Sequence, residues 1–188
     1  MKHVEKLDIS FDISELCNGL SQVLEICDWH PHHNQIGLTH SLGDGAVKGW
    51  YDAAGSLEYE WGNDAFDENG QLKKSTRKRS EQEFVTFVSE FNHTIWKHVY
   101  DVLSIRYRLG RVRLMRSKPK SCLSWHKDSE KRLHIPVITN PGARLVIEDA
   151  ANHLIADGSV YIADTTKPHT AFNAGLEPRI HFVACILD

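Results

Sequence analysis

Four side chains in the last third of the chain have the types and order of a metal site with an anion clamp. His126 and Asp128 are separated by one residue, His169 follows much later, and Arg179 lies shortly after it. Two imidazoles and one carboxylate in this order form the facial triad that holds non-haem Fe(II) and leaves other coordination positions open. A planar guanidinium matches a carboxylate bidentately. The set predicts an iron oxygenase with a dicarboxylate co-substrate.

Each of these residues taken alone has a simpler interpretation. His126 would be a surface histidine, Asp128 a loop carboxylate that caps a turn, and His169, after Pro168, a turn residue. Taken together, the residues favour a metal site. Residues i and i+2 of an extended strand point to the same side, so His126 and Asp128 can approach one ion together. The third ligand comes from a distant strand, so a closed β architecture is needed to bring it in.

The surroundings of Arg179 indicate a binding pocket. The guanidinium lies in the otherwise apolar run Pro-Arg-Ile-His-Phe-Val-Ala-Cys-Ile, where an unpaired buried charge is costly. Its partner is then either a ligand anion or a protein carboxylate. Arg132 and His134 are two residues apart and face one way, so both can point toward the same pocket, although a lone His134 is more often a satisfied core histidine. Ser117 ends the preceding strand and either adds a hydroxyl donor or is a plain strand-end residue.

The elements expected to position these residues are short strands. Apolar runs recur from Arg111 onward, separated by turn signals such as Asn140-Pro-Gly142 and Asp157-Gly158. Short strands with such spacing predict a sandwich or jelly roll, here mainly β with flanking helices. The expected strands are residues 111–117, 132–139, 143–148, 153–155, 159–163, 169–173 and 179–187.

The front half of the chain predicts helices and loops. Asp12 with Glu15 forms a possible capping box before a helix, and Ser80 with Glu83 forms a second one. Helical spacing of apolar residues after Ser80 predicts one long amphipathic helix over residues 81–103. Residues 41–79 are loop-rich and are either a lid or an ordinary surface loop. We therefore expect a single domain over 1–188, in which a helical and loop-rich part, 1–110, packs on a barrel formed by 111–188.

Composition excludes several classes of protein. The 188 residues are 41% hydrophobic and 25% charged, with a formal net charge of −3, which gives no long-range attraction to nucleic acid or anionic membranes. No window approaches the ~18 consecutive apolar residues of a membrane span. The four cysteines show no Cys-x-x-Cys or zinc-knuckle spacing, so we expect free thiols in a reducing cytoplasm.

The C-terminal motifs resemble the aspartyl/asparaginyl β-hydroxylase family of Fe(II)/2-oxoglutarate oxygenases. The resemblance covers about residues 111–188 and does not extend to the front half. The matching stretches are Arg116-Ser117, Trp125-His-Lys-Asp128, Arg132-Leu-His-Ile-Pro136, Ala163-Asp-Thr-Thr-Lys-Pro-His169 and Pro178-Arg-Ile-His-Phe182.

The resemblance implies a double-stranded β-helix, the cupin-like jelly roll, with helices packed outside it. It implies that Fe(II) is bound by His126, Asp128 and His169. It also implies contacts to 2-oxoglutarate: Arg179 with Ser117 at the distal carboxylate, and Arg132 with His134 at the carboxylate nearer the metal. The best-known animal members lack the carboxylate ligand, so Asp128 makes this chain more similar to small bacterial relatives that hydroxylate free amino acids, and it argues against a halogenase.

Two other functions stay open at this point. One is a cupin-like metalloenzyme that does not use 2-oxoglutarate, and the other is a non-catalytic metal-binding module. The substrate is a free amino acid, a peptide side chain or another small metabolite, with O2 as the second substrate, and the oligomeric state is not indicated. Trp50, Tyr51, Trp61 and Trp125 either line a substrate mouth or, more simply for most of them, pack in the core.

Overall fold

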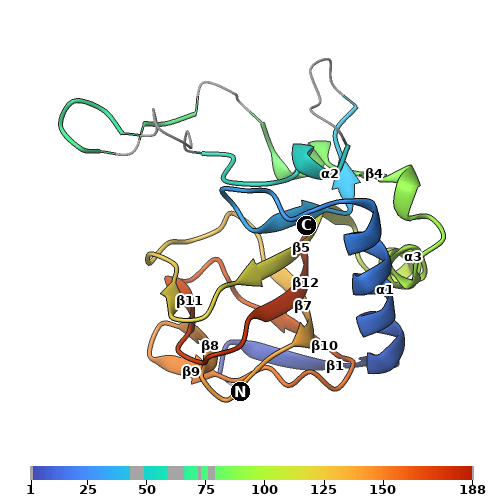
Figure 1. Ribbon diagram of the computed structural model, residues 1–188. Coiled ribbons are helices and arrows are strands. Elements are labelled where there is room, and N and C mark those ends of the chain that lie inside the picture. The colour runs from blue at the N-terminus through green and yellow to red at the C-terminus, as the bar shows by residue number, and fades with distance from the viewer. Residues whose placement is uncertain (1, 43–48, 59–65, 72, 76–78, 188) are drawn as a thin grey trace.

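Two β-sheets face each other, and helices cover the outer side of the larger sheet (Figure 1). The computed structural model describes residues 2–42, 49–58, 66–71, 73–75 and 79–187. The larger sheet contains, in spatial order, β1 (Val4–Ser10), β10 (Ser159–Ala163), β7 (Arg132–Ile138), β12 (Arg179–Ile186), β5 (Leu109–Ser117) and β2 (Gln35–Gly37). The smaller contains β6 (Ser121–Cys122), β11 (His169–Asn173), β8 (Ala143–Ile147) and β9 (Ala150–Asn152). This arrangement confirms the expected jelly roll.

Strand β12 lies at the centre of the larger sheet and separates two environments. It pairs antiparallel with β5 on one side and with β7 on the other. Because successive side chains of a strand alternate, Ile180 and Phe182 point to one face and Arg179 and His181 to the other. The first pair joins the core beneath the helices, whereas the second pair is buried inside the barrel. One strand therefore contributes both to stability and to a polar interior.

The outer face of the larger sheet is covered by α1 (Ile13–Ile26) and α3 (Ile95–Arg106) (Figure 1). Leu16, Leu20 and Val23 form the buried stripe of α1, at the helical spacing expected from the sequence. Trp96 of α3 stacks on Phe182 of β12, with ring centroids 5.8 Å apart. These contacts create the main hydrophobic core, which leaves the opposite face of the sheet free for polar residues.

Helix α1 begins at the cap that the sequence predicts. The side chain of Asp12 accepts hydrogen bonds from the backbone N–H groups of Ser14 at 2.7 Å and Glu15 at 3.1 Å. Two otherwise unpaired donors of the first turn are thereby satisfied.

The Asp12→Ala variant should be less stable than the wild type by about 1 kcal/mol, the usual effect of losing an N-cap side chain. Urea unfolding followed by circular dichroism measures the change. Asp12→Asn is the matched control, because its side-chain oxygen can still accept both bonds, and it should retain most of the stability. An equal loss in both variants would contradict the capping role.

The prediction of one long helix over 81–103 is wrong. This stretch forms the 3-10 turn η1 (Glu81–Glu83), strand β4 (Thr86–Phe87), the 3-10 turn η2 (Ser89–Phe91) and only then α3. Strand β4 pairs with β3 (Thr39–His40), and the N–H of Val88 donates to the carbonyl of Leu38. The apolar residues counted for the helix are mostly buried as expected, but long-range pairing overrides the local helical pattern. The Glu83 carboxylate does accept from the Ser80 N–H, as the capping box predicts.

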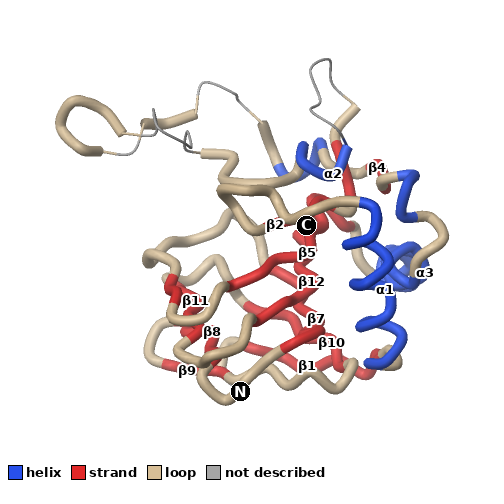
Figure 2. The backbone as a smooth tube through the Cα atoms, in the orientation of Figure 1, coloured by secondary structure: helices blue, strands red, loops and turns tan. Residues whose placement is uncertain are grey.

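The expected strands agree closely with those observed, with one exception: the strand expected at 153–155 lies earlier, as β9. Strands β1 and β2 are additions from the front half, and they extend the larger sheet at its two edges (Figure 2). Strand β1 pairs with β10, and β2 pairs with β5, while the short helix α2 (Gly49–Asp52) packs on β2. The N-terminal part therefore contributes strands to the barrel as well as covering it.

All four cysteines are unpaired, as the sequence predicts. Burial raises the pKa of Cys27 to about 11 and that of Cys185 to about 12, so both remain protonated at neutral pH. Among the described residues, no helix combines the length and apolar character required to cross a bilayer.

Candidate metal centre and anion clamp

The three predicted metal ligands lie together at one end of the barrel. His126 and His169 form an isolated antiparallel β-bridge, with N–O distances of 3.0 and 2.9 Å, and their ring centroids are 4.2 Å apart. Asp128 Oδ1 lies 4.0 Å from His126 Nε2, and Asp128 Oδ2 lies 3.9 Å from His169 Nε2. Because metal–ligand bonds are about 2.1 Å, two ligands of one ion can be up to about 4.2 Å apart. The cluster fits one ion with little adjustment.

Both imidazoles present the same nitrogen to this shared space. His126 Nδ1 lies 2.8 Å from the carbonyl oxygen of Ser124, and His169 Nδ1 lies 3.0 Å from that of Lys167. A carbonyl only accepts, so each Nδ1 is the protonated nitrogen and each Nε2 keeps its lone pair. Burial lowers the pKa of His169, which further favours the neutral ligand form.

A buried ion network holds the third ligand. Arg132 Nε donates to Asp128 Oδ2 at 3.0 Å, which leaves Oδ1 for an ion, and Arg132 Nη2 donates to Glu81 Oε1 at 2.8 Å. Glu81 also receives two bonds from Arg111, both 2.8 Å. Burial acts to raise the pKa of Glu81, but Arg111 and Arg132 outweigh it and the net pKa is lowered.

Glu81 and Arg111 are structural residues of the site that the sequence did not identify. The prediction placed Glu81 at the start of a long helix, where its contact with a distant strand is invisible. A signal for Arg111 was present, because Arg111, Arg113 and Ser117 alternate along β5 and share one face. Arginines spaced in this way inside a barrel require counter-charges from elsewhere in the chain.

Arg179 is fully buried and is not ion-paired with any carboxylate of the described residues. Arg179 of β12 is paired with Ser117 of the neighbouring strand β5. Its Nη1 donates a hydrogen bond to Ser117 Oγ at 3.2 Å. His181 lies beside its Nε and Nη2, at 3.1 and 2.9 Å. A neutral imidazole has only one bare nitrogen, so at most one of these contacts is a hydrogen bond. Burial lowers the pKa of Arg179 to about 10, so the group stays cationic with donors to spare.

His134 lies on β7, the neighbour of the strand β12 that carries Arg179, and it is paired with Val183 of β12. Its ring centroid lies 5.7 Å from that of His181. Neither of its ring nitrogens has a hydrogen-bond partner, and Nη1 of Arg132 is also buried without one. Burial, followed by the charge of Arg179, lowers the pKa of His134 well below its usual value. A neutral imidazole with two unused nitrogens is unusual in a core and indicates a place for a polar ligand.

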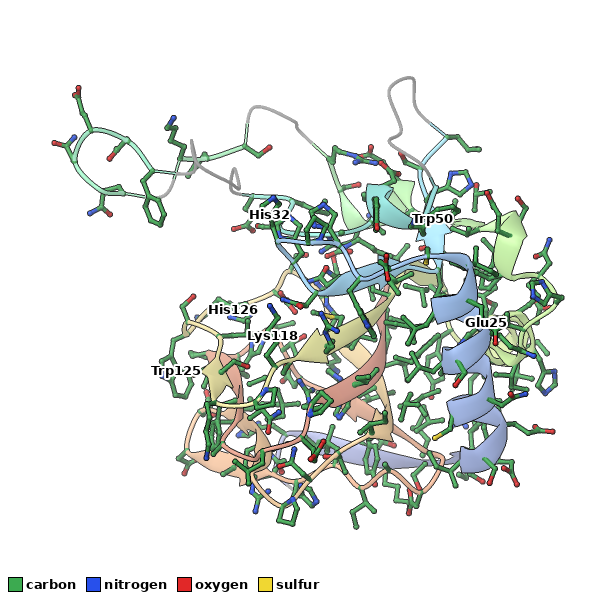
Figure 3. The ribbon with its side chains drawn as sticks, in the orientation of Figure 1. Glu25, His32, Trp50, Lys118, Trp125 and His126 are labelled. Carbon is green, nitrogen blue, oxygen red and sulfur yellow. The ribbon has the colours of Figure 1, made fainter. Side chains whose placement is uncertain are left out.

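The metal cluster is open to solvent on one side. The side chain of His126 is 41% exposed, whereas that of His169 is 5% exposed. Figure 3 shows Trp125 and His126 at the edge of the barrel, below the loop that carries His32. Trp125 is 57% exposed and is not a core residue. The exposed side of the cluster is therefore the side open to a small molecule from solvent.

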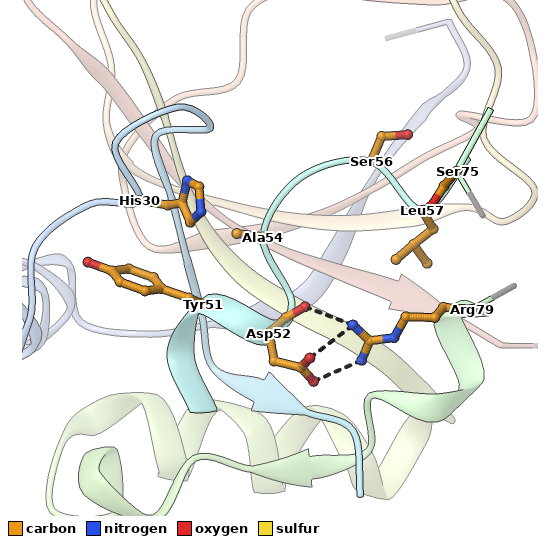
Figure 4. Close-up of a pocket in the computed structure, with 8 residues that line it drawn as sticks. All are labelled: His30, Tyr51, Asp52, Ala54, Ser56, Leu57, Ser75 and Arg79. Atoms are coloured by element: carbon orange, nitrogen blue, oxygen red, sulfur yellow. Dashed lines mark hydrogen bonds and ion pairs between the residues drawn. The ribbon is translucent and has the colours of Figure 1, made fainter. Parts of the chain in front are cut away.

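One cavity lies apart from the candidate metal ligands. It has a volume of about 200 Å³, and residues around α2 line it, including Tyr51, with the ion pair of Asp52 and Arg79 on one wall (Figure 4). None of the predicted site residues lines it. Trp50, in contrast, packs on Phe91 in the core, and Trp61 lies outside the described residues, as does part of the loop-rich region 41–79.

The sequence profile of the aspartyl/asparaginyl β-hydroxylase family matches residues 97–187. The match covers just under half of the chain, so this C-terminal region is similar to that family. The similarity supports an enzyme of the oxygenase class. The match runs from within α3 to β12 and includes the candidate metal cluster and Arg179. A search of curated protein sequences finds no significant match.

Solved structures of oxygenases and cupins are similar to this chain. A viral collagen prolyl hydroxylase from Paramecium Bursaria Chlorella virus-1, in its 2-oxoglutarate complex, is 12% identical over 98% of this chain and 95% of its own, with a TM-score of 0.53. AviO1 from Streptomyces viridochromogenes is 14% identical over 99% and 90%, with a TM-score of 0.48. A cupin domain from Bordetella pertussis is 18% identical over 43% and 84%, with a TM-score of 0.38. At these identities, the viral enzyme supports the fold alone.

Proposed function

We propose that this protein is an Fe(II)/2-oxoglutarate-dependent dioxygenase that hydroxylates a C–H bond of an amino acid or of an amino-acid side chain. One combination of features carries the proposal. A three-ligand cluster and a fully buried guanidinium without a carboxylate partner among the described residues are both inside one barrel. The cluster can hold a cation, and the buried guanidinium can bind an anion.

Fe(II) is the metal that fits this ligand set best. Two imidazole nitrogens and one carboxylate suit Fe(II) better than the thiolate-preferring metals, and they leave positions open for a chelating co-substrate and O2. With 2-oxoglutarate, bound Fe(II) supplies the chemistry that couples decarboxylation to succinate and CO2 with oxidation of a C–H bond. His126, Asp128 and His169 hold the ion from one side, and Arg132 keeps the Asp128 carboxylate in its orientation.

The remaining site residues are proposed to bind 2-oxoglutarate. Arg179 and Ser117 would hold the distal carboxylate, because the guanidinium fork has unused donors. Arg179 also lines a narrow recess together with Arg144. Arg132 Nη1 and the ring of His134 are buried and unpartnered, so Arg132 Nη1 and the one N–H of His134 would donate to the end nearer the metal. The assignment gives one ligand as the partner of Arg132 Nη1, of the His134 N–H and of the Arg179 guanidinium. It also explains why a charge network lines a barrel interior that could otherwise be apolar.

The remaining features support a small reaction partner. A net charge of −3 offers no electrostatic attraction to nucleic acid, and the unpaired cysteines suit a cytoplasmic location. The substrate is then a small molecule or a peptide, with O2 as the second substrate.

Anaerobic titration of the Fe(II)-loaded protein with 2-oxoglutarate tests the proposal. We expect a metal-to-ligand charge-transfer band that saturates at one equivalent. Aerobic incubation with amino acids and short peptides should then release succinate and give a product that is sixteen daltons heavier. If Fe(II) binds but 2-oxoglutarate gives no band and no succinate, the protein is instead a cupin-like metalloenzyme without this co-substrate or a metal-binding module.

A further inference from the structure

The inner face of the larger sheet carries more positive than negative charge. Four arginines lie on it and are nearly fully buried: Arg111, Arg113, Arg132 and Arg179. The buried carboxylate is Glu81, and the partly exposed one is Asp128. Two carboxylates cannot neutralise four guanidinium groups, and a metal ion would also draw on Asp128. Buried cations require partners, so the excess indicates ligand anions.

Two of the four arginines are paired with carboxylates of the protein. Arg111 forms a bidentate pair with Glu81, and Arg132 bonds to both Glu81 and Asp128. The Glu81 oxygens are thus both occupied by these two arginines. Arg179 is the clamp already proposed for 2-oxoglutarate, which leaves Arg113 to be explained.

Arg113 is buried with only neutral partners. Its Nη1 lies 3.0 Å from Gln35 Oε1 and 3.4 Å from the carbonyl oxygen of Gly55, and its Nε is buried with no partner. The charge of Glu81 is close enough to raise the pKa of Arg113 against the effect of burial, but no hydrogen bond joins the two side chains. Burial, followed by the nearby charge of Arg111, lowers the pKa of Arg113 to about 9, so the group remains a cation at neutral pH.

Arg113 and Arg179 belong to separate subsites. On β5, Arg113 lies four residues from Ser117, the partner of Arg179, which corresponds to about 13 Å along a strand. Burial alone lowers the pKa of Arg179, so the two guanidinium groups do not influence each other strongly. One co-substrate carboxylate at Arg179 therefore does not satisfy Arg113.

Arg113 nevertheless faces the same interior as the metal centre. It is paired with Val183 of β12, which is paired in turn with His134 of β7. Asp128 contributes to the electrostatic environment of Arg113, as do Arg132 and Glu81. The guanidinium is thus close enough to interact electrostatically with the candidate ligand Asp128. Strand β12 separates it from His134 of β7, which is proposed to contact 2-oxoglutarate.

We propose that Arg113 binds a carboxylate of the substrate and so places a neighbouring C–H bond at the metal centre. This inference rests on the proposed function and names its substrate class: small molecules that carry a free carboxylate. A guanidinium recognises a carboxylate through paired N–H donors, and such charge-assisted bonds are among the strongest in proteins. The carboxylate is either the main-chain group of a free amino acid or an acidic side chain, and the same arginine suits both.

The test compares acids with their amides in the Fe(II)- and 2-oxoglutarate-loaded enzyme. The probes are the free L-amino acids, their primary amides, and N-acetylated amides of aspartate and glutamate, which retain only a side-chain carboxylate. Binding is measured calorimetrically without O2, and turnover by succinate release. Wild-type enzyme should prefer at least one acid over its amide by about 10-fold to 100-fold, as expected for loss of a charge-assisted hydrogen bond.

Arg113→Met should remove this preference, because the variant should bind the acid more weakly while its affinity for the amide changes little. Arg113→Lys should retain part of it, because the charge persists without the planar fork. Arg116→Gln is the matched control on the same strand: Arg116 faces away from the interior, bonds to Asn34 and lies over Trp29, so its loss should leave the preference intact.

The 2-oxoglutarate charge-transfer band separates this inference from the proposed function. Arg113→Met should keep the band and the wild-type affinity for 2-oxoglutarate, which also establishes that the variant folds. If the wild type has the band but binds no acid better than its amide, or if Arg113→Met keeps the preference, the inference is wrong and the proposed function stands. If the variant loses the band while the wild type has it, Arg113 holds the metal site together and does not bind substrate, which also overturns the inference. A wild type without the band overturns both.

Discussion

His169→Ala should lose bound Fe(II) and succinate formation together. His169 supplies one of only three protein ligands, and its side chain is almost completely buried, so no other described group can replace it. Loss of residues that merely orient a ligand typically weakens metal binding by about 10-fold to 100-fold. Removal of a ligand itself should exceed that range and bring iron occupancy and turnover below detection. Metal analysis after anaerobic loading and a succinate assay measure the two losses.

A second cluster in the described part of the chain provides the control for this experiment. His3, Glu148 and Asp149 also lie close enough to share an ion, but they are on the surface, and Lys2 already pairs with Asp149. His3→Ala should therefore retain iron and activity. If His3→Ala lost the iron and His169→Ala kept it, the assignment of the metal centre would be wrong.

Arg179→Met should weaken 2-oxoglutarate binding by about 30-fold to more than 1,000-fold, while the affinity for Fe(II) changes much less. Truncating one partner of a buried charge pair typically costs about 2–5 kcal/mol, since the other charge is left unpaired. Without 2-oxoglutarate, in contrast, Arg179 has no carboxylate partner among the described residues. Its replacement by methionine should therefore not lower the free energy of unfolding of the protein. The anaerobic charge-transfer titration gives the affinity, and thermal unfolding gives the stability.

Arg144→Met is a suitable control for the clamp. Arg144 lines the same recess but donates to the backbone carbonyls of Pro141 and Ala143, so it is already satisfied. Its replacement should leave the 2-oxoglutarate affinity close to that of the wild type. In addition, 2-oxoglutarate should raise the unfolding temperature of the Fe(II) protein with Arg144→Met but hardly with Arg179→Met, because only a bound ligand stabilises the native state. Equal behaviour of the two variants would refute the role of Arg179.

The jelly-roll strands were readable from the sequence because their local pattern and their tertiary role agree. Strand β12 is apolar toward the helices and carries isolated polar residues toward the interior, and turn residues bound it on one side. The metal ligands were also readable, since His126 and Asp128 are neighbours in sequence and only His169 had to be brought in. Here local spacing and chemical type were sufficient to predict the similarity to the hydroxylase family and to predict that His126, Asp128 and His169 lie together.

The charge network around the site was decided by tertiary structure. Glu81 lies in a stretch whose apolar spacing indicates a helix, but its carboxylate is held by Arg111 and Arg132 from two different strands. Strand β4 forms because β3 offers a partner, which no local pattern reveals. The same applies to β1 and β2, which complete the larger sheet from the front half of the chain.

The sequence by itself determined which residue types are available: two imidazoles, a carboxylate and an arginine at the spacings of a metal site. Only the folded chain decided which arginines keep an unsatisfied charge. Arg132 is neutralised by protein carboxylates, whereas Arg113 and Arg179 are not. The physical reason is that the free energy of a buried charge depends on the groups around it in space, and those groups come from strands that are distant in the sequence.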